Sequence, residues 1–375
     1  MPPGKRTRIL IVDDSAVMRS LLRTVVGSDA KLEVAGVAAD GASALASVES
    51  LRPDVVLLDV EMPVIDGLNT LRQLRARGHK MPVIMCSALT QRGGRVTIQA
   101  LSNGASDYVA KPSGQSGVDA SVRILKQELL PKIHALTGGS ISVPVSAHPA
   151  ILPPMPATLP NTATPVPSTL PEVVVIGVST GGPAALDVVL PNLPAVFPVP
   201  VLIVQHMPEV FTKLLAEHLD HRCALTVREA AEKVPILPGN IYIARGNWHL
   251  EVVPASRPGQ PKTAHLTQAA PENHCRPAAD VLFRSAAAAY GAATLAVVLT
   301  GMGSDGLVGC RVIRGKGGII LAQDQQTSTV WGMPGAVTQA GVAHRVLPLG
   351  SVAAEIVRLV GRTSHEAREL RETVA

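Results

Sequence analysis

Short apolar runs alternate with amphipathic stretches in the first third of the chain. The apolar runs predict buried strands, and the amphipathic stretches predict helices. The predicted strands are Arg8–Val12, Leu32–Ala38, Asp54–Leu58, Pro82–Cys86 and Asp107–Val109. The predicted helices are Ala16–Val26, Ala42–Glu49, Gly67–Arg77, Gly94–Asn103 and Val118–Leu130. This alternation predicts an α/β domain with a doubly wound parallel sheet covered by helices on both faces.

A proline-rich stretch without charged residues interrupts the alternation. From Thr137 to Leu170 there is no Asp, Glu, Lys or Arg, and proline occurs eight times. Such a stretch cannot hold a helix or a central strand, so we expect a semi-extended linker. The predicted division is an N-terminal domain over residues 1–130, a linker over 131–170 and a C-terminal domain over 171–375.

The C-terminal part repeats the alternation with continuous apolar runs, which are typical of parallel strands buried on both faces. Its predicted strands are Val173–Gly177, Val201–Gln205, Leu295–Thr300 and Gly318–Gln323, with a further one at Ile241–Ala244. Its predicted helices are Ala184–Leu190, Phe211–His218, Ala278–Tyr290 and Leu307–Gly315. We therefore expect a second doubly wound parallel sheet.

The composition narrows the class of protein. Of the 375 residues, 46% are hydrophobic and 17% are charged, which indicates a globular protein. No apolar run reaches about 18 residues, so we expect no membrane insertion. The four cysteines lie far apart and indicate reduced thiols in the cytoplasm. The net charge of +5 is dispersed without a recognition-helix pattern, so we expect no nucleic acid partner.

Acidic and basic residues follow the predicted strands of the N-terminal domain. Asp13 and Asp14 end the first strand, Asp59 the third and Ser87 the fourth, and Lys111 follows the fifth. In an open α/β sheet such groups meet beyond the carboxyl ends of the strands. Three close carboxylates repel one another unless a cation lies between them, and oxygen ligands suit Mg²⁺. Taken singly, the aspartates fit helix N-caps and the lysine a surface position, but their common placement favours a shared site.

The N-terminal domain resembles response-regulator receiver domains over residues 6–130. The residues that carry the resemblance are Ile11-Val12-Asp13-Asp14-Ser15, Asp59, Met62-Pro63, Asp66-Gly67 and Lys111-Pro112. The resemblance implies a flavodoxin-like fold and phosphotransfer from a histidine kinase to Asp59. Asp59 is then the nucleophile, while Mg²⁺ and Lys111 neutralise the phosphoryl group. It also implies that Ser87 and Tyr108 report phosphorylation to the other domain.

A candidate nucleophile follows the first strand of the C-terminal domain. Gly177-Val178-Ser179-Thr180-Gly181 matches the G-x-S-x-G pattern of a serine on a sharp strand-to-helix turn. The alternative is a glycine-rich turn that binds phosphate or only joins strand to helix. Of the eleven histidines, His206 directly follows a buried-type strand, and Asp305 follows another. These two residues are the candidate base and its orienting carboxylate.

A different motif overlaps the segment around Asp305. Gly301-x-Gly303-x-x-Gly306 also matches the dinucleotide fingerprint, and Asp324 lies about 20 residues later, as that motif requires. A dinucleotide-dependent domain is therefore an alternative on local pattern. Its context is unusual, because the fingerprint commonly opens a domain, and this reading leaves Ser179 and His206 without a role. A DNA-binding domain or a purely scaffolding one are weaker alternatives.

Longer motifs of the C-terminal domain resemble the chemotaxis protein-glutamate methylesterase/glutamine deamidase family. They are Val178-Ser179-Thr180-Gly181-Gly182-Pro183, Val204-Gln205-His206-Met207-Pro208, Arg276-Pro277, Asp280-Val281-Leu282-Phe283-Arg284-Ser285, Leu299–Gly306, Gln323-Asp324 and Val330–Gly335. The resemblance implies a Rossmann-like domain in which Ser179, His206 and Asp305 form a catalytic triad. Ala278 and Glu209 replace residues more usual in the family, and neither belongs to the triad.

This resemblance also implies the reaction and the partners. The substrate is a glutamyl methyl ester or glutamine on the cytoplasmic helices of methyl-accepting chemoreceptors, and hydrolysis needs no cofactor. Backbone N–H groups near Thr180 or Met302 are the oxyanion candidates. Because the substrate is a helix of another protein, we expect a shallow groove, which the receiver domain covers until Asp59 is phosphorylated.

Overall fold

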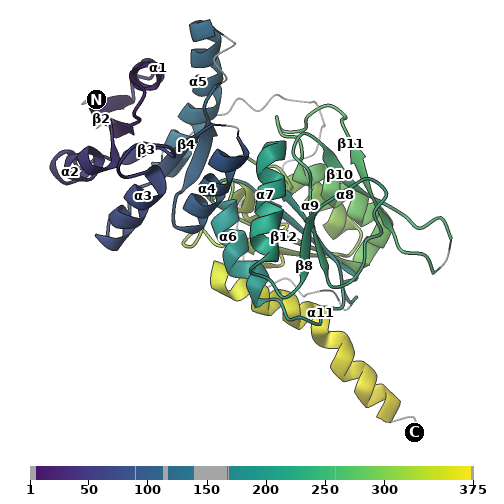
Figure 1. Cartoon of the computed structure of the whole chain (residues 1–375). Coiled ribbons are helices and arrows are strands. Elements are labelled where there is room, and N and C mark those ends of the chain that lie inside the picture. Colours follow the sequence, from purple (N-terminus) through teal and green to yellow (C-terminus); the bar gives the residue numbers. More distant parts are fainter. Residues whose placement is uncertain are drawn as a thin grey trace.

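The computed structural model describes residues 6–88, 90–112, 117–138, 167, 169–257 and 259–372, with side chains as far as residue 361. Most of the predicted linker therefore lies outside the described residues. Figure 1 shows two α/β bodies, a smaller N-terminal one and a larger C-terminal one, joined side by side. No helix among the described residues combines the length and the apolar character needed to cross a membrane.

The N-terminal domain is a five-stranded parallel sheet of order β2-β1-β3-β4-β5. Its elements are β1 (Thr7–Val12), α1 (Ala16–Gly27), β2 (Leu32–Ala38), α2 (Gly41–Leu51), β3 (Val55–Asp59), α3 (Gly67–Ala76), β4 (Val83–Ser87), α4 (Gln91–Ser102), β5 (Asp107–Ala110) and α5 (Gly117–Leu136). Every predicted strand and helix of this domain is present. The predicted flavodoxin-like topology, with β1 and β3 as neighbours, is confirmed.

Helix α5 is longer than the sequence predicted, since it continues through Pro131 to Leu136. A proline inside a helix removes one backbone hydrogen bond and usually ends or kinks the helix. Here Leu129 and Ile133, on either side of the proline, are fully buried in the core between α1, α5 and the sheet. Burial of these side chains compensates for the missing bond.

The C-terminal domain is a seven-stranded parallel sheet of order β14-β13-β12-β6-β7-β9-β8, with a separate antiparallel pair β10-β11. Its strands are β6 (Val173–Val178), β7 (Val201–Gln205), β8 (Thr226–Glu229), β9 (Asn240–Ile243), β10 (His249–Val253), β11 (Thr263–Thr267), β12 (Thr294–Val298), β13 (Ile319–Gln323) and β14 (Arg345–Leu347). Its helices are α6 (Gly182–Val189), α7 (Glu209–Asp220), α8 (Ala279–Tyr290), α9 (Leu307–Gly315), α10 (Met333–Gln339) and α11 (Leu349–Glu372).

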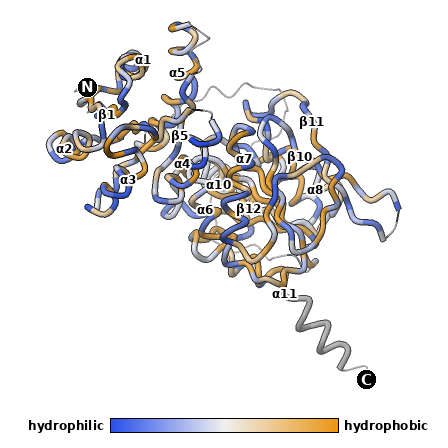
Figure 2. The backbone as a smooth tube through the Cα atoms, in the orientation of Figure 1, coloured by the Kyte–Doolittle hydropathy of each residue, from blue (hydrophilic) through white to orange (hydrophobic). Residues whose placement is uncertain are grey.

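The chain reverses direction across this sheet between β6 and β12. From β6 it continues to β7 on one side, and it returns to β12 on the other side. Ligands of open α/β sheets bind at such a switch point, beyond the carboxyl ends of the strands. The strands on both sides of this point are completely buried, and Figure 2 shows hydrophobic residues concentrated in the middle of the domain.

The two domains meet through α4 and β5 on one side and α6 and α7 on the other (Figure 1). Tyr108 of β5 packs on Phe211 of α7, with ring centroids 4.6 Å apart. Arg95 of α4 forms an ion pair of 2.9 Å with Glu217 of α7. The apolar core is continuous across this contact, so the domains pack as one body along α4 and α7.

Candidate functional site

The N-terminal domain gathers its acidic residues at the carboxyl ends of β1 and β3. Asp13 and Asp59 are buried while Asp14 is exposed, and their carboxylate oxygens lie within 4.8 Å of one another. Lys111, which follows β5, places Nζ 2.8 Å from Asp13 and 2.7 Å from Asp59. Ser87, at the end of β4, is completely buried. The structure therefore brings Asp13, Asp14, Asp59 and Lys111 together, and Ser87 ends the strand next to β3.

Burial and neighbouring charges shift the pKa values of Asp59 and Lys111. Burial raises the pKa of Asp59 to about 6, and the charge of Asp13 adds to this while Lys111 opposes it. Burial acts to lower the pKa of Lys111, but its hydrogen bonds to Asp13 and Asp59 raise the value overall. The pocket thus has more negative charge than one lysine neutralises.

The donor set fits a hard divalent cation. Three carboxylates gather here, and Lys111 is the lysine that pairs with two of them, including Oδ2 of Asp13 at 2.8 Å. Such a cluster of carboxylate oxygens is suited to an all-oxygen ion such as Mg²⁺. Asp13, Asp14 and Asp59 are the residues that would hold it.

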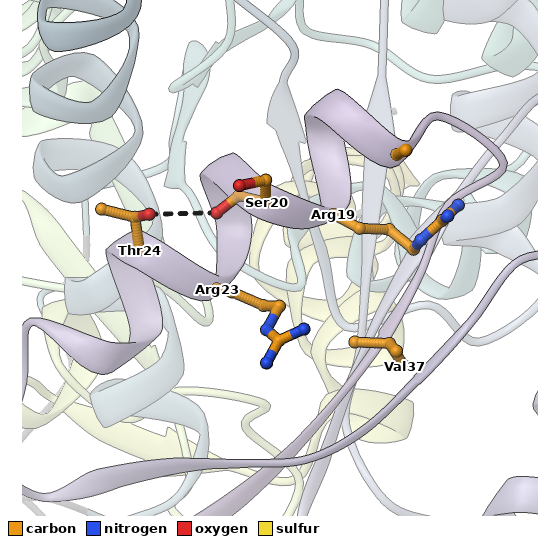
Figure 3. A pocket seen from close by; sticks show the side chains of 6 residues that line it. Arg19, Ser20, Arg23, Thr24 and Val37 are labelled. Atoms are coloured by element: carbon orange, nitrogen blue, oxygen red, sulfur yellow. Dashed lines mark hydrogen bonds between the residues drawn. The ribbon is translucent and has the colours of Figure 1, made fainter.

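A depression of about 540 Å³ lies next to this pocket, on α1 and β2 (Figure 3). Arg19, Arg23 and Val37 are among the residues that line it. Arg19 also donates hydrogen bonds to the backbone oxygens of Asp13, at 2.7 Å, and Asp14, at 2.9 Å. Arg19 therefore fixes the loop that carries two of the acidic residues.

Ser179 lies in the turn between β6 and α6 and is half-buried. The backbone N–H of Ser179 donates to the backbone oxygen of Thr300 at 3.0 Å. The backbone oxygen of Ser179 accepts from the side-chain amide of Gln205 at 3.0 Å. Gly181 takes the left-handed conformation of the turn, with φ of 78°, and an added Cβ would lie 2.5 Å from the hydroxyl of Thr329. Glycine at 181 is therefore required by both conformation and space.

His206 and Asp305 form a close pair beside this turn. Nε2 of His206 lies 2.7 Å from Oδ2 of Asp305, and the His206 side chain is 11% exposed. Burial acts to lower the pKa of His206, but hydrogen bonds to Asp305 and Cys275 raise it to about 10. Among the hydrogen bonds of the described residues, none joins Ser179 to His206. With Nε2 bound to Asp305, Nδ1 is the nitrogen left to accept a proton.

The carboxylate of Asp305 is surrounded by donors. Besides His206, it accepts from the backbone N–H groups of Ala279, Asp280 and Gly306 and from the side-chain amide of Asn273, at 2.6 to 3.0 Å. Two of these N–H groups belong to the first turn of α8, which favours a negative charge. Burial opposes ionisation, but these bonds keep the pKa of Asp305 below its usual value.

Sequence reasoning missed three residues around this pair. Asn273 donates to both Asp305 and Asp280, at 3.0 Å each. Burial, together with the charge of Asp305, raises the pKa of Asp280 to about 6. Cys275 Sγ lies 3.6 Å from Nδ1 of His206. The asparagine and the cysteine belong to a turn far from the triad residues in sequence, and no periodic pattern marks them.

One oxyanion candidate, Thr180, follows Ser179 in the chain, and the other, Met302, follows Gly301. Neither the N–H of Thr180 nor that of Met302 donates to another backbone group in the described part of the chain. Gly301 packs against Ser179, since an added Cβ would lie 2.8 Å from the serine Cβ. Both N–H groups are thus available near the nucleophile, and their role stays a prediction.

The same geometry gives the glycines of the Gly301–Gly306 segment a use that needs no dinucleotide. Gly301 makes room for Ser179, and Gly306 begins α9 with φ of 90°. Asp324, the expected ribose ligand of that alternative, accepts hydrogen bonds within its own turn from Thr327. The segment serves the serine site instead.

The N-terminal domain reaches this site directly. Thr180, the residue after the nucleophile, donates from Oγ1 to Asp107 Oδ2 at 2.7 Å, and both side chains are buried. Lys132 of α5 holds the other oxygen of Asp107 at 3.0 Å. The start of β5 is thereby fixed against the turn that carries Ser179.

The chain is similar to known proteins over nearly its whole length. Residues 174–356 match the family model for CheB methylesterase, and residues 9–123 match the response regulator receiver domain. A protein-glutamate methylesterase/protein-glutamine glutaminase of Trichodesmium erythraeum is 46% identical over 94% of this chain and 99% of its own length. One from a Nocardioides species is 48% identical over 95% and 96%. The solved catalytic domain of Thermotoga maritima CheB methylesterase is 43% identical, covering 51% of this chain and 99% of that domain, with a TM-score of 0.49.

Proposed function

This chain belongs to the protein-glutamate methylesterase/protein-glutamine glutaminase family, and we propose that it hydrolyses glutamyl methyl esters on chemoreceptors with a triad of Ser179, His206 and Asp305. The observation that carries the proposal is the buried His206–Asp305 pair beside a serine at the switch point of the sheet. The same site deamidates receptor glutamines, because ammonia replaces methanol as the leaving group.

The reaction begins with proton transfer from Ser179 Oγ to Nδ1 of His206. The serine oxygen forms a bond to the γ-carbonyl carbon of the ester, and the oxyanion accepts hydrogen bonds from the N–H groups of Thr180 and Met302. The carbon–methoxy bond breaks, and His206 returns the proton to methanol. Water, deprotonated by the same nitrogen, then hydrolyses the acyl-serine and restores the glutamate side chain.

Asp305 fixes the ring of His206 and stabilises its protonated form. Since Asp305 occupies Nε2, the proton-accepting nitrogen is Nδ1, and the chain order of the triad is Ser–His–Asp. The order in α/β-hydrolases is Ser–Asp/Glu–His, so the triad here is built on a different fold. No cofactor is needed for these steps.

The receiver domain makes this a phosphorylation-controlled enzyme. Asp59 accepts the phosphoryl group from a histidine kinase, and Lys111 binds the added charge. Mg²⁺, held by Asp13, Asp14 and Asp59, supplies further neutralisation of the phosphoryl oxygens when bound. The clustering of the three carboxylates within 4.8 Å of one another supports this metal assignment.

In the resting form the receiver covers the groove at Ser179. The support is the contact between Asp107 and Thr180, together with the packing of Tyr108 on Phe211. Phosphorylation shifts the population to an uncovered form through Ser87 and Tyr108. In this scheme the receiver extends to Leu136, where α5 ends, residues 171–375 carry catalysis, and the linker lies between them. The four cysteines are free, which favours the cytoplasm, where receptor methylation sites and kinase are expected.

Substitution of the nucleophile tests the proposal. We expect Ser179→Ala to lower methanol release from methylated receptor by several orders of magnitude, because no other serine lies at this turn. Acetyl phosphate should still phosphorylate the variant at Asp59, which controls for folding. Retention of more than a small fraction of the rate would contradict the serine mechanism.

A further inference from the structure

A tight turn holds Cys275 in place beside the triad. Glu272 and Cys275 exchange two backbone hydrogen bonds of 3.1 and 2.8 Å. Asn273 and His274 between them have φ of 51° and 63°, which is the geometry of a type I′ turn. Arg284 of α8 anchors the turn through Glu272 at 2.6 Å. The thiol is therefore part of a built structure and not of a loose loop.

The turn contacts both members of the His–Asp pair. Asn273 donates to Asp305, and Sγ of Cys275 lies 3.6 Å from Nδ1 of His206. Nε2 of the same ring is bound to Asp305. The thiol is thus in contact with the nitrogen that the mechanism assigns to Ser179, while Ser179 itself has no hydrogen bond to that ring in the described residues.

We propose that Cys275 is a positioning residue for His206. The sulfur of Cys275 contacts Nδ1 of His206 in the resting enzyme and competes with Ser179 for that nitrogen. The inference rests on the proposed triad and adds a residue that the triad does not require. When Nδ1 carries a proton, the sulfur accepts a hydrogen bond from it and so stabilises the protonated ring, which is the form that His206 must leave before it acts as a base. Cys275 therefore sets the pH range in which the esterase works.

The surroundings of His206 agree with this role. Against the effect of burial, the hydrogen bonds of His206 to Asp305 and to Cys275 both raise its pKa. Other charges near the pair are already balanced or buried. They are Asp280 with Asn273, Glu272 with Arg284, and Glu209 of α7 with Arg245. Removal of Cys275 should consequently change the pKa of His206 without unpairing these neighbouring charges.

The test measures kcat/KM for methanol release from pH 6 to 10 with the full-length protein. Because the neutral imidazole is the active base, a lower pKa gives more active enzyme at neutral pH. We expect Cys275→Ala to move the rising limb at least one pH unit towards acid and to increase the rate at pH 7 about tenfold. Cys275→Ser keeps a hydrogen-bonding group at this position. Its pH–rate profile should therefore lie between those of Cys275→Ala and the unaltered protein.

A second readout does not depend on activity. The ring proton on Cε1 of His206, assigned by comparison with His206→Gln, should titrate at lower pH in Cys275→Ala than in the unaltered protein. Cys223→Ala, which removes another half-buried thiol, should leave both the titration and the rate profile unchanged.

The outcomes separate this inference from the proposed function. A Cys275→Ala variant with a lower rate at every pH, an unshifted limb and an unshifted His206 titration would show that the cysteine is only structural. Activity of Ser179→Ala in the same assay would instead overturn the triad. If Ser179→Ala is inactive and the two Cys275 profiles coincide with that of the unaltered protein, only the role of Cys275 fails.

Discussion

At the scale of single residues, Asp305 is set apart by the number of groups that donate to it. Its oxygens accept five hydrogen bonds, from three backbone N–H groups, Asn273 and His206. All of these partners are donors, so the NH₂ group of an asparagine at this position would find no acceptor among them. The negative charge is therefore part of the local fold as well as of the catalytic pair.

This leads to a prediction for Asp305→Asn. The amide NH₂ would face donors, leaving buried groups unpaired at about 1–3 kcal/mol. We expect both a lower melting temperature and a rate reduced about 10⁴-fold. Ser179→Ala, at a position without such a network, should lose the rate but keep the melting temperature. Equal melting temperatures for Asp305→Asn and Ser179→Ala would contradict the structural role of the charge.

The same substitution has a definite pH dependence. The folded-state pKa of Asp305 lies below its ordinary value of 3.8. The ionised carboxylate therefore adds stability above that ordinary pKa, and this contribution is lost as the pH falls through the folded-state pKa. The difference in melting temperature between the unaltered protein and Asp305→Asn should be full at neutral pH and should shrink in acid.

Residues at strand ends could be predicted from the sequence, whereas residues in the supporting turn could not. Ser179, His206 and Asp305 each follow an apolar run, and a parallel sheet brings such positions together. Asn273 and Cys275 lie in a tight turn outside the main sheet, which reaches His206 and Asp305 from about 30 to 70 residues away in the chain. Nothing in the periodicity of the chain encodes that contact, so it appears only in three dimensions.

At the scale of elements, the contact between α4 and α7 depends on a residue without a side chain. Gly94 of α4 faces α7, and an added Cβ would lie 2.5 Å from the Cδ1 atom of Leu214. Leu214 is buried, so it must repack to make room. Alanine favours the helix itself more than glycine does. Substitution at this position therefore acts on the interface and not on α4.

We accordingly expect Gly94→Ala to raise methanol release in the absence of a phosphodonor. Overpacking costs about 1–3 kcal/mol and weakens the closed arrangement, so the basal rate should rise severalfold. Gly27→Ala, at the end of α1, is the matched control because an added Cβ there meets nothing within 4 Å. A basal rate unchanged by Gly94→Ala would argue against closure through α4 and α7.

The strands that the sequence predicted in the C-terminal domain are almost entirely buried. Strands such as β6, β7 and β12 are continuous apolar runs, and their burial is complete. The strands that sequence reasoning missed are exposed on at least one side, among them β8 at the sheet edge and β14, whose residues are mostly exposed. An edge strand needs only a partial apolar pattern, so it is not distinguished from a loop.

At the scale of the whole molecule, two units with separate parallel sheets share one continuous core along α4, α6 and α7. A tether between them keeps the receiver at high effective concentration near the groove. Under the proposed scheme, even a modest contact then keeps the receiver over Ser179, although a longer tether weakens this effect. Regulation is therefore a property of the assembled chain.

The corresponding prediction compares three proteins. Acetyl phosphate with Mg²⁺ should stimulate methanol release by the full-length enzyme but not by Asp59→Asn, in which the amide cannot form the acyl phosphate. A fragment starting at Pro171 should exceed the basal rate of the full chain and should ignore the donor. Equal basal rates for the fragment and the full chain would show that phosphorylation stimulates the catalytic domain itself and does not act by removing the receiver from the site at Ser179. Stimulation of Asp59→Asn would contradict the acceptor assignment.

The bond between Asp107 and Thr180 has a consequence that runs in the opposite direction to signalling. This hydrogen bond links the receiver to the turn that carries Ser179, so both take part in the proposed equilibrium between the covered and uncovered forms. When two sites bias the same equilibrium, each affects the other by the same factor. If phosphorylation of Asp59 increases affinity for the receptor by some factor, a bound receptor stabilises the phosphorylated receiver by the same factor. A substrate helix resting in the groove would then help to keep its own hydrolase switched on.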